Sequence, residues 1–491
     1  MIQQADETRQ PKTAQGAQGE AFGQAGKWLV FLIVGISIFM STLDSSIVNI
    51  ALPTIMADLS VSMETIQWVV VIYLATVTSL LLAFGRLSDI FGRRYVFLRG
   101  LLIFTAGSAL CGVAPSAAWL IGSRCFQAMG AAMIMACTPA LIVDTFPPSE
   151  RGRGLGMMGT TVAAGMTVGP ALGGLILKFF PWRVIFYINI PVGAAAVIAT
   201  LKILKAQNHG RLREPFDWPG AVLLAVACTS FLYGVSHAEQ WGVWTLKTLG
   251  MAGVFIVSLL FLLACEKKGA SPLLDLSLWR IRLFTASILA AVAMFMSLFM
   301  AVFLLPFFLQ QPAGFSPGKT GLFMVVPFLF LSLGAPLAGG ASDKIGSRLP
   351  STLGMCLLAA SFFSLGTLDA DAGTWPLFWR LALTGIGTAL FSSPNSLAVM
   401  NAVPEKRRGV AAGTVATARN LGMVMGVAMA SAVFNAAFAS ATGGIRLAAY
   451  RPEFKEAFMT AFHLSTFCGG LVAFIGAVLS YLKGKEGPRT A

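Results

Sequence analysis

The sequence predicts an all-α, polytopic membrane protein that consists of two six-helix bundles and two inserted helices. Of its 491 residues, 56% are hydrophobic and only 11% are charged, whereas an ordinary soluble domain has about 25% charged residues. Apolar runs of about 20 residues, long enough to cross the hydrocarbon core of a membrane as a helix, recur along nearly the whole chain. These runs lack the alternation of β-barrel strands, so we expect helices to be the spanning elements.

A charged segment that occurs twice divides the chain into two related halves. GRLSDIFGRR at 85–94 follows an apolar run, and GGASDKIGSR at 339–348 repeats its Gly, Ser-Asp, Gly and final Arg positions. A second pair, PSERGRG at 148–154 and PEKRRG at 404–409, recurs at nearly the same offset. Related halves of this kind are the sequence sign of a secondary transporter.

Apolar periods separated by Gly, Pro and charge clusters predict fourteen membrane helices. In chain order they are expected near 28–54, 66–88, 95–114, 117–142, 153–177, 182–204, 218–236, 248–266, 283–310, 319–341, 350–369, 374–398, 409–438 and 458–482. The two charged segments then follow the second and the tenth of these helices, so the seventh and eighth lie between the halves.

The halves and their connections define five predicted regions. We expect a disordered cytoplasmic tail at 1–27, an N-terminal bundle at 28–204, a linker with two extra helices at 205–282, a C-terminal bundle at 283–482 and a cytoplasmic tail at 483–491. Lys and Arg gather in the loops that an N-in, C-in orientation places in the cytoplasm, as positively charged loops do. The net charge of +14 is thereby explained by membrane topology and does not indicate nucleic-acid binding.

The repeated charged loop is expected to act as a conformational latch. Gly85 and Gly92 permit a tight turn, Asp89 can face a positive helix terminus, and Arg93 and Arg94 keep the loop on the cytoplasmic side. The corresponding latch residues of the second half are Gly339, Asp343, Gly346 and Arg348.

These motifs resemble the major facilitator superfamily, whose hallmark loop has the form G-x-L-x-D-x-x-G-R-R/K. LDSSIVNIALP at 43–53, WRVIFYINIP at 182–191 and ARNLGMVMGVA at 418–428 are similar to segments of its fourteen-helix drug/proton antiporters of the EmrB/QacA type, although Ser46 replaces the usual Thr. The resemblance implies export of amphipathic drugs or toxic compounds across the cytoplasmic (inner) membrane in exchange for protons. In a Gram-negative host it also implies a periplasmic adaptor and an outer-membrane channel as partners.

The fifth predicted helix carries closely spaced glycines. Gly165, Gly169 and Gly173 recur at a spacing of four and form one smooth face for close helix contact, beside which Pro170 permits a bend. Small residues at this spacing are common in membrane helices, so generic packing is an alternative. With the Gly-Pro and Gly-Gly pairs in register, which include Gly174, the segment resembles the antiporter motif of the superfamily.

Asp44 is the only acidic residue that we place deep inside a span, and an intramembrane carboxylate indicates function. Arg124 is expected at the same depth to within one helical turn. In the family that the chain resembles, the Arg of R-x-x-Q is linked to proton transfer; Arg124 and Gln127 match it, and Ala128 replaces the usual Gly. Asp44 and Arg124 are therefore the proton-coupling candidates, and a permanent structural ion pair is the alternative.

Gln127, Arg380, Arg419 and Phe303 are candidates for a substrate cavity. If the two additional arginines face such a cavity, they favour anionic or neutral substrates over dications; pairing with backbone carbonyls is the alternative for each. Phe303 belongs to a row of phenylalanines at a spacing of four, which could instead be a packing stripe.

Other classes of function lack their signatures. GxxxxGK[ST] does not occur, and no soluble segment is long enough for an ATPase domain. The seven cysteines show no CxxC spacing, so we expect no metal site. Without a nucleotide-binding signature, transport must use an ion gradient or the gradient of the substrate itself. We expect no cofactor, and the resemblance implies a proton gradient as the driving force. The alternatives are a dedicated exporter of one metabolite or siderophore and, more remotely, a membrane enzyme or receptor.

Overall fold

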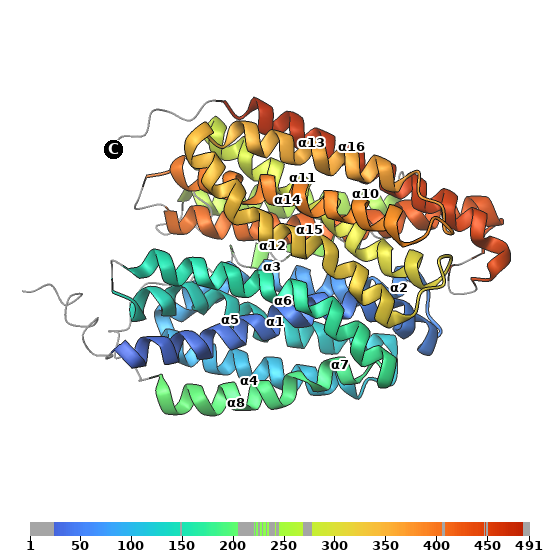
Figure 1. The fold of residues 1–491 in the computed structure, drawn as a ribbon. Helices are drawn as coiled ribbons and strands as arrows, with labels where there is room; N and C mark the ends of the chain where they lie inside the picture. The colour runs from blue at the N-terminus through green and yellow to red at the C-terminus, as the bar shows by residue number, and fades with distance from the viewer. Residues whose placement is uncertain are drawn as a thin grey trace, which may run out of the picture.

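The computed structural model describes residues 24–147, 150–204, 245–268, 277–404, 408–445 and 450–484, together with residue 447 and scattered positions between 220 and 241. Within these residues the elements are helical, and they form two bundles (Figure 1). The first bundle, blue to green, lies beside the second, yellow to red, and the long helices of both run in nearly the same direction.

The first bundle holds the helices of the N-terminal half. They are α1 (Gln24–Asp58), α2 (Met63–Ile66), α3 (Trp68–Phe91), α4 (Arg93–Gly112), α5 (Ala117–Thr145), α6 (Arg151–Phe179), α7 (Val184–Tyr187) and α8 (Asn189–Ile203). The second predicted helix is divided into α2 and α3, and the sixth into α7 and α8. Helix α1 begins at Gln24, four residues before the predicted start, and its Lys27 pairs with Glu150 at 2.7 Å.

The second bundle repeats this order. After α10 (Leu246–Lys268) and a short 3-10 turn at Leu278–Arg280 come α11 (Arg282–Gln310), α12 (Pro317–Ile345), α13 (Arg348–Leu365), α14 (Thr374–Asn401), α15 (Arg408–Thr442), a 3-10 turn at Pro452–Phe454 and α16 (Lys455–Leu482). Of the predicted helix at 218–236, scattered positions between 220 and 234 are described, and these are helical.

Eleven of the described helices are long and apolar enough to cross a membrane. The apolar part of α10, Leu246–Leu262, is shorter, and α14 has sufficient length but is not among the eleven. The described residues therefore support eleven to thirteen spans, and the predicted count of fourteen and the N-in, C-in orientation stay predictions.

Two glycines reverse the chain at the repeated loops. Gly92 between α3 and α4 has φ +96°, and Gly346 between α12 and α13 has φ +79°, a left-handed conformation that glycine adopts without steric cost. Both loops lie at the end of the molecule where α1 begins and α16 ends, which we call the loop end. We call the other end, where α1 reaches Asp58, the far end.

The two halves pack closely toward the far end. The Nε2 of Gln310 on α11 donates to the carbonyl oxygen of Ile50 on α1 at 3.1 Å. On α6 and α12, a Cβ at Gly174 would lie 2.7 Å from the oxygen of Pro317, and a Cβ at Gly321 would lie 2.5 Å from that of Pro170. Only glycine allows the two backbones to approach this closely, so these residues close the far end.

Candidate functional site

Asp44 lies in the interior of the first bundle and is fully buried. Its Oδ2 accepts a hydrogen bond from the Nη1 of Arg124 at 2.5 Å. Its Oδ1 accepts from the Nε2 of Gln127 at 3.0 Å and from the Nδ2 of Asn189 at 2.7 Å. The expectation that Asp44 and Arg124 lie at the same depth is confirmed, because the two side chains are in direct contact.

Arg124 is almost completely buried, with 1% of its surface exposed. Besides Asp44, it donates from Nη1 to the Oε1 of Gln127 at 2.7 Å and from Nε to the carbonyl oxygen of Val69 at 3.1 Å. The ring of Tyr73 lies against the guanidinium at 4.1 Å, a favourable position for a cation over an aromatic face.

Five helices build this network. Helix α5 supplies Arg124 and Gln127, which lie three residues apart and therefore share one face. Helix α8 supplies Asn189, its first residue, just after the break at the end of α7. Helix α1 supplies Asp44, α3 supplies Tyr73, and α4 supplies Ser108, whose hydroxyl lies 2.7 Å from the Nε2 of Gln127.

This arrangement makes the charge state of Asp44 consequential. A buried charge is costly unless an opposite charge and hydrogen bonds compensate it. Adding a proton to Asp44 would remove the charge that Arg124 neutralises and one acceptor site of the network. The network is therefore satisfied in the form in which both Asp44 and Arg124 are charged.

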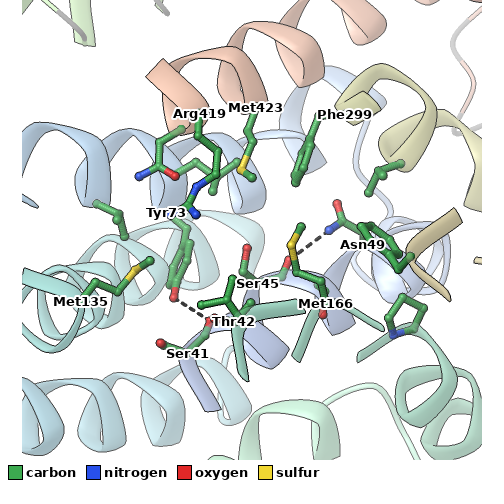
Figure 2. Close-up of a pocket in the computed structure, with 18 residues that line it drawn as sticks. Ser41, Thr42, Ser45, Asn49, Tyr73, Met135, Met166, Phe299, Arg419 and Met423 are labelled. Carbon is green, nitrogen blue, oxygen red and sulfur yellow. Dashed lines mark hydrogen bonds between the residues drawn. The ribbon is translucent and has the colours of Figure 1, made fainter. Parts of the chain in front are cut away.

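A cavity lies between the two halves, beside this network (Figure 2). Helices α1, α3, α5 and α6 of the first half line it together with α11, α12 and α15 of the second. Its wall is mostly apolar, and its polar members include Ser41, Ser45, Asn49, Arg419 and Asn420. A mostly apolar wall with a few polar groups is the usual composition of a ligand-binding cavity.

Tyr73 separates the cavity from the ion pair. Its side chain lines the cavity, its ring rests on Arg124, and its hydroxyl donates to the carbonyl oxygen of Ser41 at 3.2 Å. Asp44 itself does not line the cavity. Ser41 and Ser45 on the same helix do, so α1 presents its hydroxyl residues to the cavity and its carboxylate to the interior of the first bundle.

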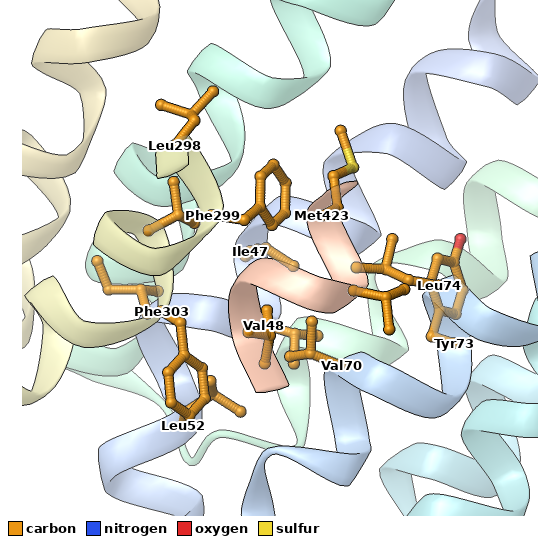
Figure 3. Close-up of a cluster of buried hydrophobic side chains, with 14 of the residues drawn as sticks. Ile47, Val48, Leu52, Val70, Tyr73, Leu74, Leu298, Phe299, Phe303 and Met423 are labelled. Carbon is orange, nitrogen blue, oxygen red and sulfur yellow. The ribbon is translucent and has the colours of Figure 1, made fainter. Parts of the chain in front are cut away.

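Buried apolar side chains from both halves gather next to the cavity (Figure 3). Leu52 and Val48 of α1 lie with Phe303 and Phe299 of α11 in this cluster, and Met423 joins it from α15. Phe299 lines the cavity, whereas Phe303 is fully buried in the cluster and does not. The predicted place of Phe303 in the cavity wall is therefore corrected to a packing position between the halves.

Two further cavity candidates lie elsewhere. Gln127 is fully buried inside the ion-pair network and does not reach the cavity. Arg380 donates from Nε to the carbonyl oxygen of Ser364 and from Nη1 to that of Pro376, both at 2.8 Å. Arg380 therefore pairs with backbone carbonyls, as the alternative interpretation expected, because these oxygens lie within reach of its side chain near the start of α14.

Arg419 is the cavity candidate that the structure places in the wall, where its side chain extends from α15 toward α1 (Figure 2). Its Nε atom is buried and has no hydrogen-bond partner among the described residues. The side chain as a whole is partly buried.

The glycine face of α6 packs on α1. A Cβ at Gly165 would lie 3.1 Å from the oxygen of Phe39, one at Gly169 would lie 3.0 Å from the Cβ of Ser46, and one at Gly173 would lie 2.6 Å from the Cγ2 of Ile50. The spacing of four thus produces the close helix contact that the sequence predicts. Gly174, on the neighbouring face, contacts α12 instead, and Pro170 lines the cavity.

The loop residues at the loop end make contacts within their own halves. Arg93 pairs with Asp144 of α5, and Arg94 donates to the carbonyl oxygen of Leu201 at 3.0 Å. Arg348 donates to the oxygen of Tyr481 at 2.8 Å. A Cβ at Gly339 would lie 2.8 Å from the Oγ of Ser393, whereas Gly85 has no atom within 4 Å of its Cβ direction. The side chains of Asp89 and Asp343 lie outside the described part of the structure.

Sequence reasoning missed several polar members of the site. Asn189 lies in the motif at 182–191 but received no role, although a polar residue in the apolar run IFYINIP is itself a signal. Ser108 and Asn49 gave no signal beyond being polar residues in apolar helices, which many membrane helices contain. Asn420, next to Arg419, was likewise unassigned.

Comparisons with known proteins agree with this architecture. Residues 34–427 match the family described as Major Facilitator Superfamily. The chain is 36% identical over 457 residues to the riboflavin transporter RibZ of Clostridioides difficile, covering 92% of this chain and 97% of that one. It is 34% identical to the multidrug resistance protein Stp of Mycobacterium tuberculosis (84% and 77% covered). It is 32% identical to the tetracenomycin C resistance and export protein of Streptomyces glaucescens (85% and 79%).

A solved structure has the same fold. The inward-facing, unoccupied crystal structure of a bacterial homologue of the lysosomal transporter Spinster superposes with a TM-score of 0.69 at 15% identity, covering 94% of this chain and 97% of that one. The match in sequence spans most of the chain, and the two bundles supply the corresponding fold. The chain therefore belongs to the major facilitator superfamily, and it is a multi-pass secondary transporter of the cytoplasmic membrane and not an enzyme.

Proposed function

We propose that this transporter is a proton-coupled antiporter that exports amphipathic drugs or toxic compounds by alternating access. It would be a member of the fourteen-helix EmrB/QacA type, with both termini and the loop end in the cytoplasm. The observation that carries the proposal is the buried Asp44–Arg124 pair next to a cavity shared by the two halves. The relatives named for multidrug resistance and tetracenomycin C export support the substrate class.

The proposed cycle couples the proton to the cavity through Tyr73. A proton that reaches Asp44 from the outside weakens the attraction between its carboxylate and Arg124. The guanidinium of Arg124 lies against the ring of Tyr73, which is part of the cavity wall. A bound substrate favours the charged pair and the proton-free state. Because linkage is reciprocal, the proton then weakens substrate binding by the same factor by which the substrate weakens proton binding.

Reconstituted vesicles test this proposal. Purified protein in proteoliposomes with an imposed pH gradient should move a fluorescent amphipathic dye, and Asp44→Asn should abolish the gradient-driven part. Asp58→Asn is the matched control, because Asp58 also lies on α1 but at its exposed far end, where it pairs with Arg183 at 3.1 Å. Gradient-driven movement by Asp44→Asn at the wild-type rate would reduce the pair to a structural role.

A second candidate function is transport of one dedicated metabolite. The relative named as a riboflavin transporter, which matches nearly the full length of this chain, favours it. Susceptibility profiling of a deletion strain against many unrelated toxic compounds separates the two candidates. Broad sensitivity supports multidrug export, whereas unchanged susceptibility together with a defect in a single compound supports the dedicated transporter. The partnership with an adaptor and an outer-membrane channel rests on the resemblance alone.

A further inference from the structure

Three buried polar atoms in the cavity wall have no hydrogen-bond partner within the described part of the chain. They are the Nε of Arg419, the Nδ2 of Asn420 and the Oδ1 of Asn49. Buried polar groups in proteins are nearly always paired, so exceptions ask for an explanation. Here the two unsatisfied donors come from α15, and the unsatisfied acceptor comes from α1 on the other half. The set is therefore shared between the two bundles that move relative to each other in the proposed cycle.

Arg419 brings a positive charge that no neighbour in the described residues compensates. None of the 18 residues that line the cavity is acidic, and Arg419 takes part in none of the ion pairs between described residues. The buried carboxylate, Asp44, is already engaged by Arg124. An uncompensated guanidinium in an apolar wall is costly, and an anion bound there would offset that cost.

The surroundings of Arg419 fit the apolar body of an organic molecule better than a bare inorganic ion. Phe299, Phe328, Met135, Met166 and Met423 line the same space. Aromatic and methionine side chains adapt to flat or irregular apolar groups. In Figure 2, Arg419 and Asn49 approach the space from different sides, with Phe299 and Met166 on the side of Asn49.

We propose that this part of the cavity is an acid-binding subsite for the transported molecule. Arg419 and Asn420 donate to an anionic oxygen group, Asn49 accepts an N–H or O–H of the same molecule, and the apolar residues hold its body. The shared chemistry is a carboxylate, a sulfonate or an ionised ring oxygen on an aromatic or otherwise apolar frame. This inference rests on the proposed function in one respect, namely that the cavity holds the transported molecule.

A charge-matched pair of probes tests the subsite. Binding of naphthoate and of the uncharged naphthamide, which have nearly the same shape, would be measured by calorimetry at neutral pH with the full chain in lipid nanodiscs. A charge-assisted hydrogen bond predicts that the wild type binds the carboxylate about ten- to a hundredfold more tightly than the amide. Equal affinities, or no binding of either probe, would overturn the proposal.

Substitutions test whether Arg419 produces the preference for the carboxylate over the amide. Arg419→Gln should lose the preference for the carboxylate and keep its affinity for the amide. Arg380→Gln is the matched control, since this arginine belongs to the same half but pairs with carbonyl oxygens away from the cavity, and it should keep the preference. Arg419→Lys should retain part of it, because lysine preserves the charge but not the planar fork. A full preference in Arg419→Gln would contradict the assignment.

Two further variants keep the test informative if Arg419→Gln does not fold, and they separate the subsite from the proposed proton coupling. If Arg419→Gln does not fold, Asn420→Ala, which removes one donor and no charge, should still weaken carboxylate binding more than amide binding. Asp44→Asn should keep the preference for the carboxylate, because Asp44 lies outside the cavity. Loss of gradient-driven transport in Asp44→Asn with an intact preference would support both proposals. If the wild type shows no preference for the carboxylate but its transport is still coupled to protons, the subsite proposal fails and the proposed function stands.

Discussion

The two halves repeat one topology but hold their charges differently. In the first half, Asp44 and Arg124 form a buried pair whose hydrogen-bonding atoms have partners among α3, α5 and α8. Helix contacts that recur in both halves, Gly100 with Gly130 and Gly354 with Gly387, place Leu381 of α14 where Arg124 stands on α5. Leu381 is fully buried and apolar, so this position carries no charge in the second half.

The second half instead presents its cation to the cavity. Arg419 of α15 corresponds to Val162 of α6, which also lines the cavity, because Gly422 meets α11 as Gly165 meets α1. On α15, Gly422 and Gly426 take over the packing role, since a Cβ at either residue would meet carbonyl oxygens of α11. The comparison shows that the two halves of one fold place charge differently: the first half holds a buried ion pair, and the second half places a guanidinium in the cavity wall.

The largest expected effect comes from making the first half resemble the second. Arg124→Leu leaves Asp44 buried without its counter-charge, which should destabilise the protein by about 3–5 kcal/mol. The double variant Asp44→Leu/Arg124→Leu should recover most of this loss, because apolar residues of similar volume often replace a buried ion pair at little cost. Thermal unfolding in detergent measures both. A double variant as unstable as the single one would show that the pair is needed for the fold itself.

The contact between α6 and α12 should give the next largest effect. Gly321→Ala places a methyl group 2.5 Å from the carbonyl oxygen of Pro170, and overpacking of this kind costs about 1–3 kcal/mol. The cost falls on the state in which the far end is closed, so the populations should shift toward an open far end. Distances between spin labels on the two halves at that end would report the shift.

Gly340→Ala is the control for this experiment. Gly340 lies on the same helix, and a Cβ there would meet no atom within 4 Å. Alanine at an unobstructed helical position should stabilise the helix by up to about 1 kcal/mol. The same distance distribution in both variants would indicate that the α6–α12 contact does not decide which end is closed.

Substitutions of Tyr73 should have smaller effects on stability, and they separate the contributions of its two contacts. Tyr73→Phe removes only the hydroxyl that donates to the oxygen of Ser41, a loss of about 0.5–1.5 kcal/mol. Tyr73→Leu also removes the ring from Arg124, which adds about 0.5–2 kcal/mol. We expect both variants to fold, and only Tyr73→Leu to impair coupling in the vesicle assay. Equal coupling defects in the two would assign the role to the hydroxyl.

The smallest effect is expected at the exposed end of α1. Asp58→Asn breaks a solvent-exposed pair with Arg183, and such pairs contribute about 0–1 kcal/mol. The change in the midpoint of thermal unfolding should therefore be slight. A loss as large as that of Arg124→Leu would contradict the distinction between the buried and the exposed pair.

The sequence predicted the features that follow from strong local rules. Hydropathy located most helix cores, and the repeated motif marked the two chain reversals at which Gly92 and Gly346 adopt positive φ. Asp44 was selected as a proton-coupling candidate because a carboxylate inside a span is costly. The cavity wall was harder to predict, because which face of a helix meets the other half depends on tertiary packing. Phe303 and Arg419 both lie in apolar helices, yet one is buried between the halves and the other borders the cavity.

Proton release on substrate binding tests the central claim most directly. A fluorescent amphipathic dye would be added to purified protein in weakly buffered detergent solution, and the change in pH would be recorded near the midpoint of proton binding. If Asp44 exchanges its proton against substrate, the wild type should release up to about one proton per molecule. Asp44→Asn should bind the dye without release, whereas Asp58→Asn should behave as the wild type. Equal proton release by Asp44→Asn would contradict the account.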